Sequence, residues 1–171
     1  MDYFWESNKK ADLKLYNAKN YKCNKVKLKL GCAYYNPDEY EKSYFSGIIY
    51  KGWHNTGFLK DFQPIYYDKK MGKIISRLFA IQVYYKYRRK NIAADAISGL
   101  VEIIKENYGL SNGLKLDSIM TSAGEKAFLK IAQRLEAENI ISGYEVCMDA
   151  EIISDYEIDD CNKDNFIFLK F

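Results

Sequence analysis

The spacing of apolar residues changes several times along the chain, and each change predicts a different element. Apolar and polar residues alternate strictly over Lys25–Leu30, which is typical of a strand with one buried face. Shorter apolar stretches bounded by turn residues predict further strands over 44–50, 58–67 and 114–121. These segments are therefore expected to form strands of a sheet.

The longest apolar run is Ile74–Val83, and its near continuity favours a strand in the middle of a sheet. Ala93–Tyr108 then has apolar residues at helical spacing, as does Glu125–Glu138. Alternation returns over Tyr144–Ile152, and Asn165–Phe171 is a final apolar stretch. The second half of the chain thus predicts the order strand, helix, strand, helix, strand, strand.

This order predicts an α/β fold with a mixed, mostly antiparallel sheet, a central parallel pair and flanking helices. The parallel pair is expected because the helix over 93–108 connects two predicted strands. A helix in such a connection carries the chain back over the sheet, so that the next strand runs in the same direction as the first. The last two strands are expected to pair antiparallel across the acidic loop 154–164. With 171 residues and no visible linker, we expect one domain over residues 1–171.

Composition narrows the class of protein. Apolar residues make up 48% and charged residues 29%, with a net charge of +3, as in an ordinary globular chain. We see no apolar run long enough for a membrane span and no secretory signal, so a cytoplasmic protein without membrane contact is expected. The four cysteines form no C-x-x-C pair and the single histidine is His54, which argues against zinc. Abundant Lys, Asn, Ile and Tyr suggest AT-rich coding, as in a low-GC bacterium, a phage or a mobile element.

Leu78–Ala93, with the sequence LFAIQVYYKYRRKNIA, carries the clearest chemical signal. An apolar strand ends at Val83, a basic and aromatic turn follows, and Asn91 opens a helix. The first N–H groups of a helix have no partner inside it and lie at the positive end of its dipole, which favours phosphate. The three cations over Arg88–Lys90 strengthen that preference. The alternative is a solvated basic turn with no ligand.

This stretch resembles the central motif of the GNAT superfamily of acyl-CoA N-acyltransferases, R/Q-x-x-G-x-G/A after an apolar strand that ends in valine. Val83 matches that valine, Arg88 the first motif position and Ala93 the last. Asn91 stands where the family has its first glycine. Asparagine is the side chain that best tolerates left-handed backbone, so the turn can be preserved.

The resemblance implies acetyl-CoA (coenzyme A) as cofactor and a divergent member of the family. Its pyrophosphate would lie on the turn and its pantetheine arm and acetyl group along the strand over 80–83. The cofactor-binding residues implied are Ile81, Gln82, Val83, Arg88, Arg89, Lys90, Asn91, Ile92 and Ala93.

The acid–base residues common in this family are missing from their usual places. The strand over 74–83 contains no carboxylate, and the helix over 125–138 contains no tyrosine. We therefore consider His54, Tyr84 and Tyr85 as replacements, since each can exchange a proton and lies near a predicted strand end. Glu39 and Glu41 lie in a predicted turn and short helix at 36–41, a segment that often lines the acceptor site of such folds, and the alternative is that they are solvated turn carboxylates.

The leading hypothesis is an N-acetyltransferase that acts on a primary amine of a small molecule, a protein or an aminoacyl-tRNA. The alternative is a catalytically degenerate GNAT-like binding protein, for instance a phage or mobile-element factor that binds a host protein. A third hypothesis is a tRNA- or ribosome-directed module that uses the basic, lysine-rich N-terminal third. A homodimer stays open, and nucleic acid other than tRNA is not expected. The acidic run over 155–164 is interpreted as a solvated loop.

Overall fold

The computed structural model describes residues 15–32, 45–117, 119, 121–154, 157–158 and 164–171. Their elements, in chain order, are β1 (Tyr16–Lys22), β2 (Lys27–Cys32), β3 (Phe45–Lys51), β4 (His54–Asp68), β5 (Lys73–Val83), the 3₁₀ turn η2 (Tyr85–Tyr87), α1 (Ile92–Asn107), β6 (Gly113–Leu116), α2 (Ser122–Ala137), β7 (Gly143–Met148), β8 (Ile152–Ser154), β9 (Glu157–Ile158) and β10 (Asn165–Lys170).

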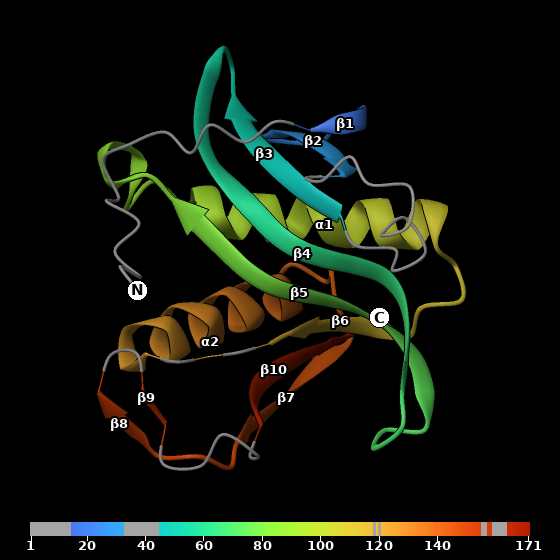
Figure 1. The fold of residues 1–171 in the computed structure, drawn as a ribbon, viewed down its shortest axis with the longest axis vertical. Helices are drawn as coiled ribbons and strands as arrows, with labels where there is room; N and C mark the ends of the chain where they lie inside the picture. Colours follow the sequence, from blue (N-terminus) through green and yellow to red (C-terminus); the bar gives the residue numbers. More distant parts are fainter. Residues whose placement is uncertain (1–14, 33–44, 118, 120, 155–156, 159–163) are drawn as a thin grey trace.

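Eight strands form one sheet in the order β1-β2-β3-β4-β5-β6-β10-β7, and β8 and β9 form a separate small hairpin. Only β5 and β6 run parallel within the described sheet, and α1 is the connection between them. The other neighbours are antiparallel, including the predicted pair β7 and β10. The predicted fold class, a mixed and mostly antiparallel sheet with a central parallel pair and flanking helices, is confirmed (Figure 1).

Both helices pack on a common apolar core. In α1 the residues at helical spacing, among them Ile97, Leu100 and Ile104, are fully buried against strands such as β2. In α2 the apolar stripe ends in Leu135, also fully buried. The hydroxyl of Thr121 caps α2 by accepting a hydrogen bond from the N–H of Gly124, at 2.9 Å. Burial of this kind, rather than helix propensity, fixes where each helix lies.

The strand β1 was not predicted. Its side chains are half-buried or exposed along its whole length, so neither alternation nor an apolar run marks it. It pairs antiparallel with β2 and forms one edge of the sheet. Lys19 and Lys22 lie on it, and charged residues of this kind are common on edge strands because they oppose pairing with another chain.

Two predicted strands are shorter than expected, for one reason. The carboxamide of Asn165 is buried and bonds to both backbone groups of Ala150, at 2.9 and 3.0 Å. The backbone N–H of Ile119 donates to the carbonyl oxygen of Asn165 at 3.1 Å. These bonds end β7 at Met148 instead of Ile152 and β6 at Leu116 instead of Thr121.

The predicted turn and helix over 36–41, with Glu39 and Glu41, lie outside the described residues, as does most of the acidic loop. Among the described helices, none is both long and apolar enough to cross a membrane.

We predict that Gly57→Ala lowers the free energy of unfolding by about 2 kcal/mol or more, because its new methyl group would collide with the carbonyl oxygen of Gln82 on β5. Urea unfolding measures the effect. Gly109→Ala is the control, since nothing lies within 4 Å of the position of its methyl group. Equal stability of the two variants would contradict this close contact between β4 and β5.

Candidate cofactor-binding and active site

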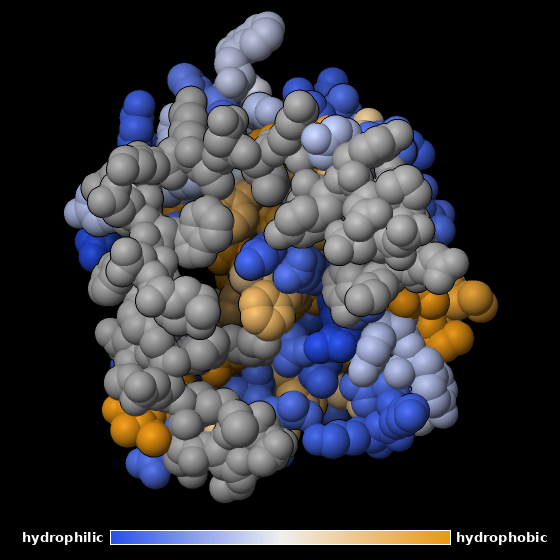
Figure 2. Space-filling model, viewed as in Figure 1, coloured by the Kyte–Doolittle hydropathy of each residue, from blue (hydrophilic) through white to orange (hydrophobic). Residues whose placement is uncertain are grey.

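The parallel ladder between β5 and β6 is short. It joins Ser76–Leu78 of β5 to Leu114–Leu116 of β6, and its last bond runs from the N–H of Asp117 to the carbonyl oxygen of Leu78, at 3.0 Å. β6 pairs with β10 on its other side, and this contact continues to Ile119, whose N–H donates to the carbonyl oxygen of Asn165. The two central strands therefore part after Leu78. On the face of the molecule that Figure 2 shows, the surface is hollowed near the middle, and apolar atoms lie beside polar ones there.

Beyond this point β5 continues through Phe79–Val83 with β4 as its neighbour on one side. In the described part of the chain, no residue of β6 pairs with that segment. The strand also changes its alternation here, because Leu78 and Ile81, three residues apart, both pack on the same core. Asp61, which lies opposite Phe79 on β4, has a positive φ of 52°. A bent strand with one open backbone edge can pair with an extended ligand.

The turn that follows β5 leads into α1 through left-handed backbone. Arg89 has a φ of 60°, and the N-cap residue Asn91 has φ 60° and ψ 18°. A left-handed residue followed by a helical one turns successive N–H groups to the same side and forms an anion-binding nest. Among the described residues, none accepts a hydrogen bond from the backbone N–H groups of residues 89–94. The motif asparagine thus has the conformation that the family glycine would supply.

Charges around the turn favour an anion. Arg88, Arg89 and Lys90 are exposed, and Nε of Arg88 donates to the carbonyl oxygen of Val83 at 3.1 Å, which ties the turn to the end of β5. The acidic residue in the first turn of α1, Asp95, is neutralised by Arg134 of α2 at 3.2 Å. The cations of the preceding turn therefore add to the positive end of the α1 dipole. The carboxylate in the first turn of α1 does not cancel this positive charge, because it is paired with Arg134.

The three predicted acid–base residues lie at this end of the sheet but differ in exposure. Tyr84 is 5% exposed, and its N–H donates to the carbonyl oxygen of Thr56 at 2.9 Å. Tyr85 is 66% exposed, with the Arg88 guanidinium 5.9 Å from its ring centre. His54 is exposed at the start of β4, and its ring centre lies 6.1 Å from that of Tyr87. Tyr85 and His54 thus flank the turn from the solvent side, whereas the Tyr84 side chain is buried.

An ion pair that the sequence did not reveal lies where the two strands part. Arg77 of β5 contacts the carboxylate of Asp117 at 2.6 Å, and its guanidinium lies 4.4 Å from the ring centre of Tyr66. Both side chains are partly buried, at 28% and 11% exposure. Arg77 is the one charged residue inside the mostly apolar run over 74–83, and this charge is the signal that could have indicated the pair. The pair joins β5 to the residue that follows β6, at the point where the parallel ladder between these two strands ends.

The described residues offer no group of three or more His, Cys, Asp or Glu side chains that could hold a metal ion. Of the cysteines, Cys23 is half-buried beside α1. Burial first, and then the charges of Glu102 and Glu106, raise the pKa of its thiol to about 11. It stays protonated near neutral pH and is a poor nucleophile there. Cys23 is therefore not a candidate nucleophile for the chemistry of the β5–α1 junction.

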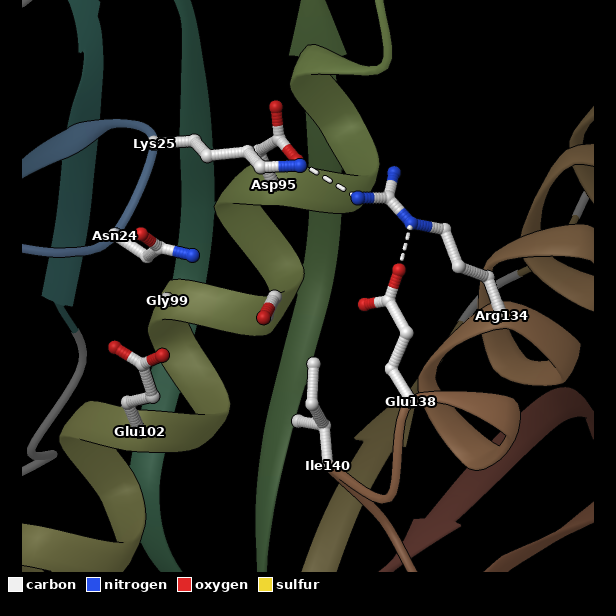
Figure 3. A pocket seen from close by; sticks show the side chains of 9 residues that line it. Asn24, Lys25, Asp95, Gly99, Glu102, Arg134, Glu138 and Ile140 are labelled. Carbon is white, nitrogen blue, oxygen red and sulfur yellow. Dashed lines mark hydrogen bonds and ion pairs between the residues drawn. The ribbon is translucent and has the colours of Figure 1, made fainter.

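A second hollow, of about 70 Å³, lies on the helix side of the molecule (Figure 3). Arg134 crosses it and pairs with both Asp95 and Glu138, at 3.2 and 3.0 Å. Its lining comes from the β1–β2 turn, α1 and the end of α2: Asn24, Lys25, Asp95, Ser98, Gly99, Glu102, Arg134, Glu138 and Ile140. None of the predicted site residues belongs to it, so it is separate from the β5–α1 junction.

No family model and no curated protein matches the chain. Solved structures do resemble it. A GNAT family acetyltransferase from Elizabethkingia anophelis with acetyl-CoA bound is 12% identical over 78% of this chain and 79% of its own, with a TM-score of 0.49. Diaminobutyrate acetyltransferase from Paenibacillus lautus, in complex with its substrate and coenzyme A, is 17% identical over 73% and 68%, with a TM-score of 0.46.

A Pyrococcus horikoshii protein is 12% identical over 76% of this chain, with a TM-score of 0.49, and the match spans 66% of its own length, just under two thirds. Because these TM-scores lie below 0.5, a function for this chain must rest on the geometry of its own β5–α1 junction.

We predict that Asn91→Gly unfolds at least as late as the wild-type chain, whereas Asn91→Val loses about 1–2 kcal/mol of stability, because a branched side chain is strained at φ 60°. Thermal or urea unfolding gives both values. Lys90→Gly is the control: Lys90 is exposed and has no positive φ, so glycine brings no relief there. A valine variant as stable as the wild type would contradict the left-handed turn.

Proposed function

We propose that the chain is an acyl-CoA-dependent N-acetyltransferase. The observation that carries the proposal is the junction of β5 with α1. An open strand edge over Phe79–Val83 leads directly into a turn whose N–H groups have no protein partner among the described residues. Acetyl-CoA has the matching form, an extended amide-containing arm that ends in a pyrophosphate. The GNAT-like motif, with acetyl-CoA as its implied cofactor, supports the same assignment.

In this proposal the turn and the first helical turn hold the pyrophosphate through residues 88–93, and the strand over Ile81–Val83 holds the arm. Ile81 and Val83 pack on the core, which keeps this edge rigid. A backbone N–H near Val83 polarises the thioester carbonyl group. Arg88 adds charge and, through its bond to the carbonyl oxygen of Val83, keeps the strand end in register with the turn.

The thioester supplies an activated acetyl group: the amine nitrogen bonds to the carbonyl carbon, the carbon–sulfur bond breaks, and coenzyme A leaves as a thiolate. The chain must then remove one proton from the amine and deliver one to the sulfur. Tyr85 and His54 are exposed beside the turn and can reach solvent or ligand. Tyr84, which follows β5, is only 5% exposed and would have to act from inside the protein. The acceptor is a primary amine on a small molecule, a protein or an aminoacyl-tRNA.

Calorimetric titration tests the cofactor assignment. We expect acetyl-CoA to bind the wild-type chain, and Arg88→Ala to weaken binding by about tenfold through lost charge and a looser turn. Arg88→Lys should recover only part of the loss, because lysine keeps the charge but not the planar guanidinium. Lys29→Ala, a change on the distant strand β2, is the control for general charge effects. No heat with acetyl-CoA, or unchanged affinity in Arg88→Ala, would refute the assignment.

One observation favours a second candidate, a catalytically degenerate binding protein that grips a host protein. β5 carries no carboxylate and α2 carries no tyrosine, so the groups that commonly move protons in this family are absent from both elements. In this candidate the chain has the fold of an acetyltransferase but does not catalyse acetyl transfer.

Release of free thiol from acetyl-CoA separates the two candidates. The acetyltransferase proposal predicts turnover with at least one member of a panel of small amines, peptides and charged tRNAs, and reduced turnover in Tyr85→Phe and His54→Ala. Tyr67→Phe, at an exposed tyrosine near the other end of β4, is the matched control. Cofactor binding with no thiol release over the whole panel, together with a stoichiometric protein partner, would favour the binding protein.

A further inference from the structure

The first turn of α1, which lies beside the proposed pyrophosphate site, contains one carboxylate, that of Asp95. Its side chain is only 5% exposed. Side chains on a helix lean toward its N-terminus, so this carboxylate leans toward the start of α1. A negative charge there interacts favourably with the helix dipole, and for the same reason it competes with a bound phosphate. An anionic ligand is therefore repelled by Asp95 unless another group compensates the charge.

The compensating charge comes from the other helix. Nη2 of Arg134, on α2, donates to Oδ1 of Asp95 at 3.2 Å, and Nε of the same guanidinium donates to Glu138 at 3.0 Å. Figure 3 shows Arg134 reaching across the hollow between the two helices, with one carboxylate on either side of it. Among the described residues, no other cation pairs with Asp95. One side chain of α2 therefore sets the net charge at the first turn of α1.

Burial makes this compensation important. The side chains of Asp95 and Arg134 are 5% and 28% exposed, so salt and water screen them less than the exposed cations of the preceding turn. Removal of the cation would leave a buried, unpaired carboxylate close to the proposed site of the diphosphate. Removal of the carboxylate would leave a cation that still pairs with Glu138. The two halves of the pair are thus expected to have different effects on an anionic ligand.

We propose that Arg134 is a positioning residue for the cofactor, which acts through Asp95 to keep the phosphate-binding start of α1 free of net negative charge. The inference rests on the proposed function and assigns part of the cofactor affinity to α2, an element that contributes nothing to the GNAT-like motif. A purely structural pair, which only holds α1 against α2, would behave differently, because its loss from either side would have the same effect.

A double-mutant cycle tests the proposal, with the affinity for acetyl-CoA measured by calorimetry on the full chain. Arg134→Gln should weaken binding by about tenfold, as expected for one uncompensated charge within a Debye length of the diphosphate, and added salt should reduce this loss. Asp95→Asn should bind at least as tightly as the wild type, and the double variant should return to within about threefold of it. Glu138→Gln breaks the other bond of the same guanidinium and is the matched control, which should change nothing.

The outcomes separate this inference from the proposed function. If the wild-type chain does not bind acetyl-CoA, the proposed function fails and this inference fails with it. If acetyl-CoA binds but Arg134→Gln has the wild-type affinity, or the double variant is no better than Arg134→Gln, only this inference is overturned. Equal losses in Arg134→Gln and Asp95→Asn would also overturn it, because the pair would then only hold the helices together.

Thermal unfolding shows whether each variant folds. If Arg134→Gln alone does not fold, Asp95→Asn and the double variant still decide the question. Both lack the ion pair and neither has an unpaired carboxylate in the first turn of α1. Both should therefore bind acetyl-CoA about as tightly as the wild type, and a loss of affinity in both would overturn the inference.

Discussion

The hydrogen bonds of one buried asparagine determine where the sheet opens. Asn165, 4% exposed, bonds through its carboxamide to both backbone groups of Ala150, while its carbonyl oxygen accepts from Ile119. These bonds hold the chain after β6 against β10, the strand with which β6 already pairs. Because a buried carboxamide without partners is costly, this arrangement is strongly specified. The parallel ladder consequently stops at Leu78, and the rest of β5 keeps one open edge.

The start of α1 is the second constraint, and burial holds it in place. Ile92 is 2% exposed and Ile97 is fully buried, so core packing fixes where the helix begins and where its first N–H groups, which have no acceptor inside a helix, lie. The left-handed residues Arg89 and Asn91 leave those groups pointing away from protein acceptors. Local strain and unpaired donors of this kind are retained where the surrounding packing is strong, and they concentrate at functional sites. The salt bridge from Arg134 to Asp95 adds to this support from α2.

The open edge of β5 over Phe79–Val83 leads directly into the turn whose N–H groups have no acceptor among the described residues. In the proposed function, the strand edge would hold the pantetheine arm and the turn would hold the pyrophosphate. The carboxylate at the closed end of this opening, Asp117, is paired with Arg77, so the proposed proton transfers are assigned to the exposed side chains Tyr85 and His54. The cofactor side of the proposed enzyme is thus better defined than its acid–base side.

The sequence by itself determined the central strand, both helices, the antiparallel end of the sheet and the junction at Asn91. These features depend on local patterns: apolar periodicity, a capping position and a residue type that tolerates left-handed backbone. The edge strand β1, the early end of β6 and the ion pair of Arg77 with Asp117 were decided only by tertiary structure. So was the position of His54 beside Tyr87, since these residues are brought together by strand register. Periodicity records which side of an element is buried, whereas the partners of an element are chosen by contacts between residues far apart in the chain.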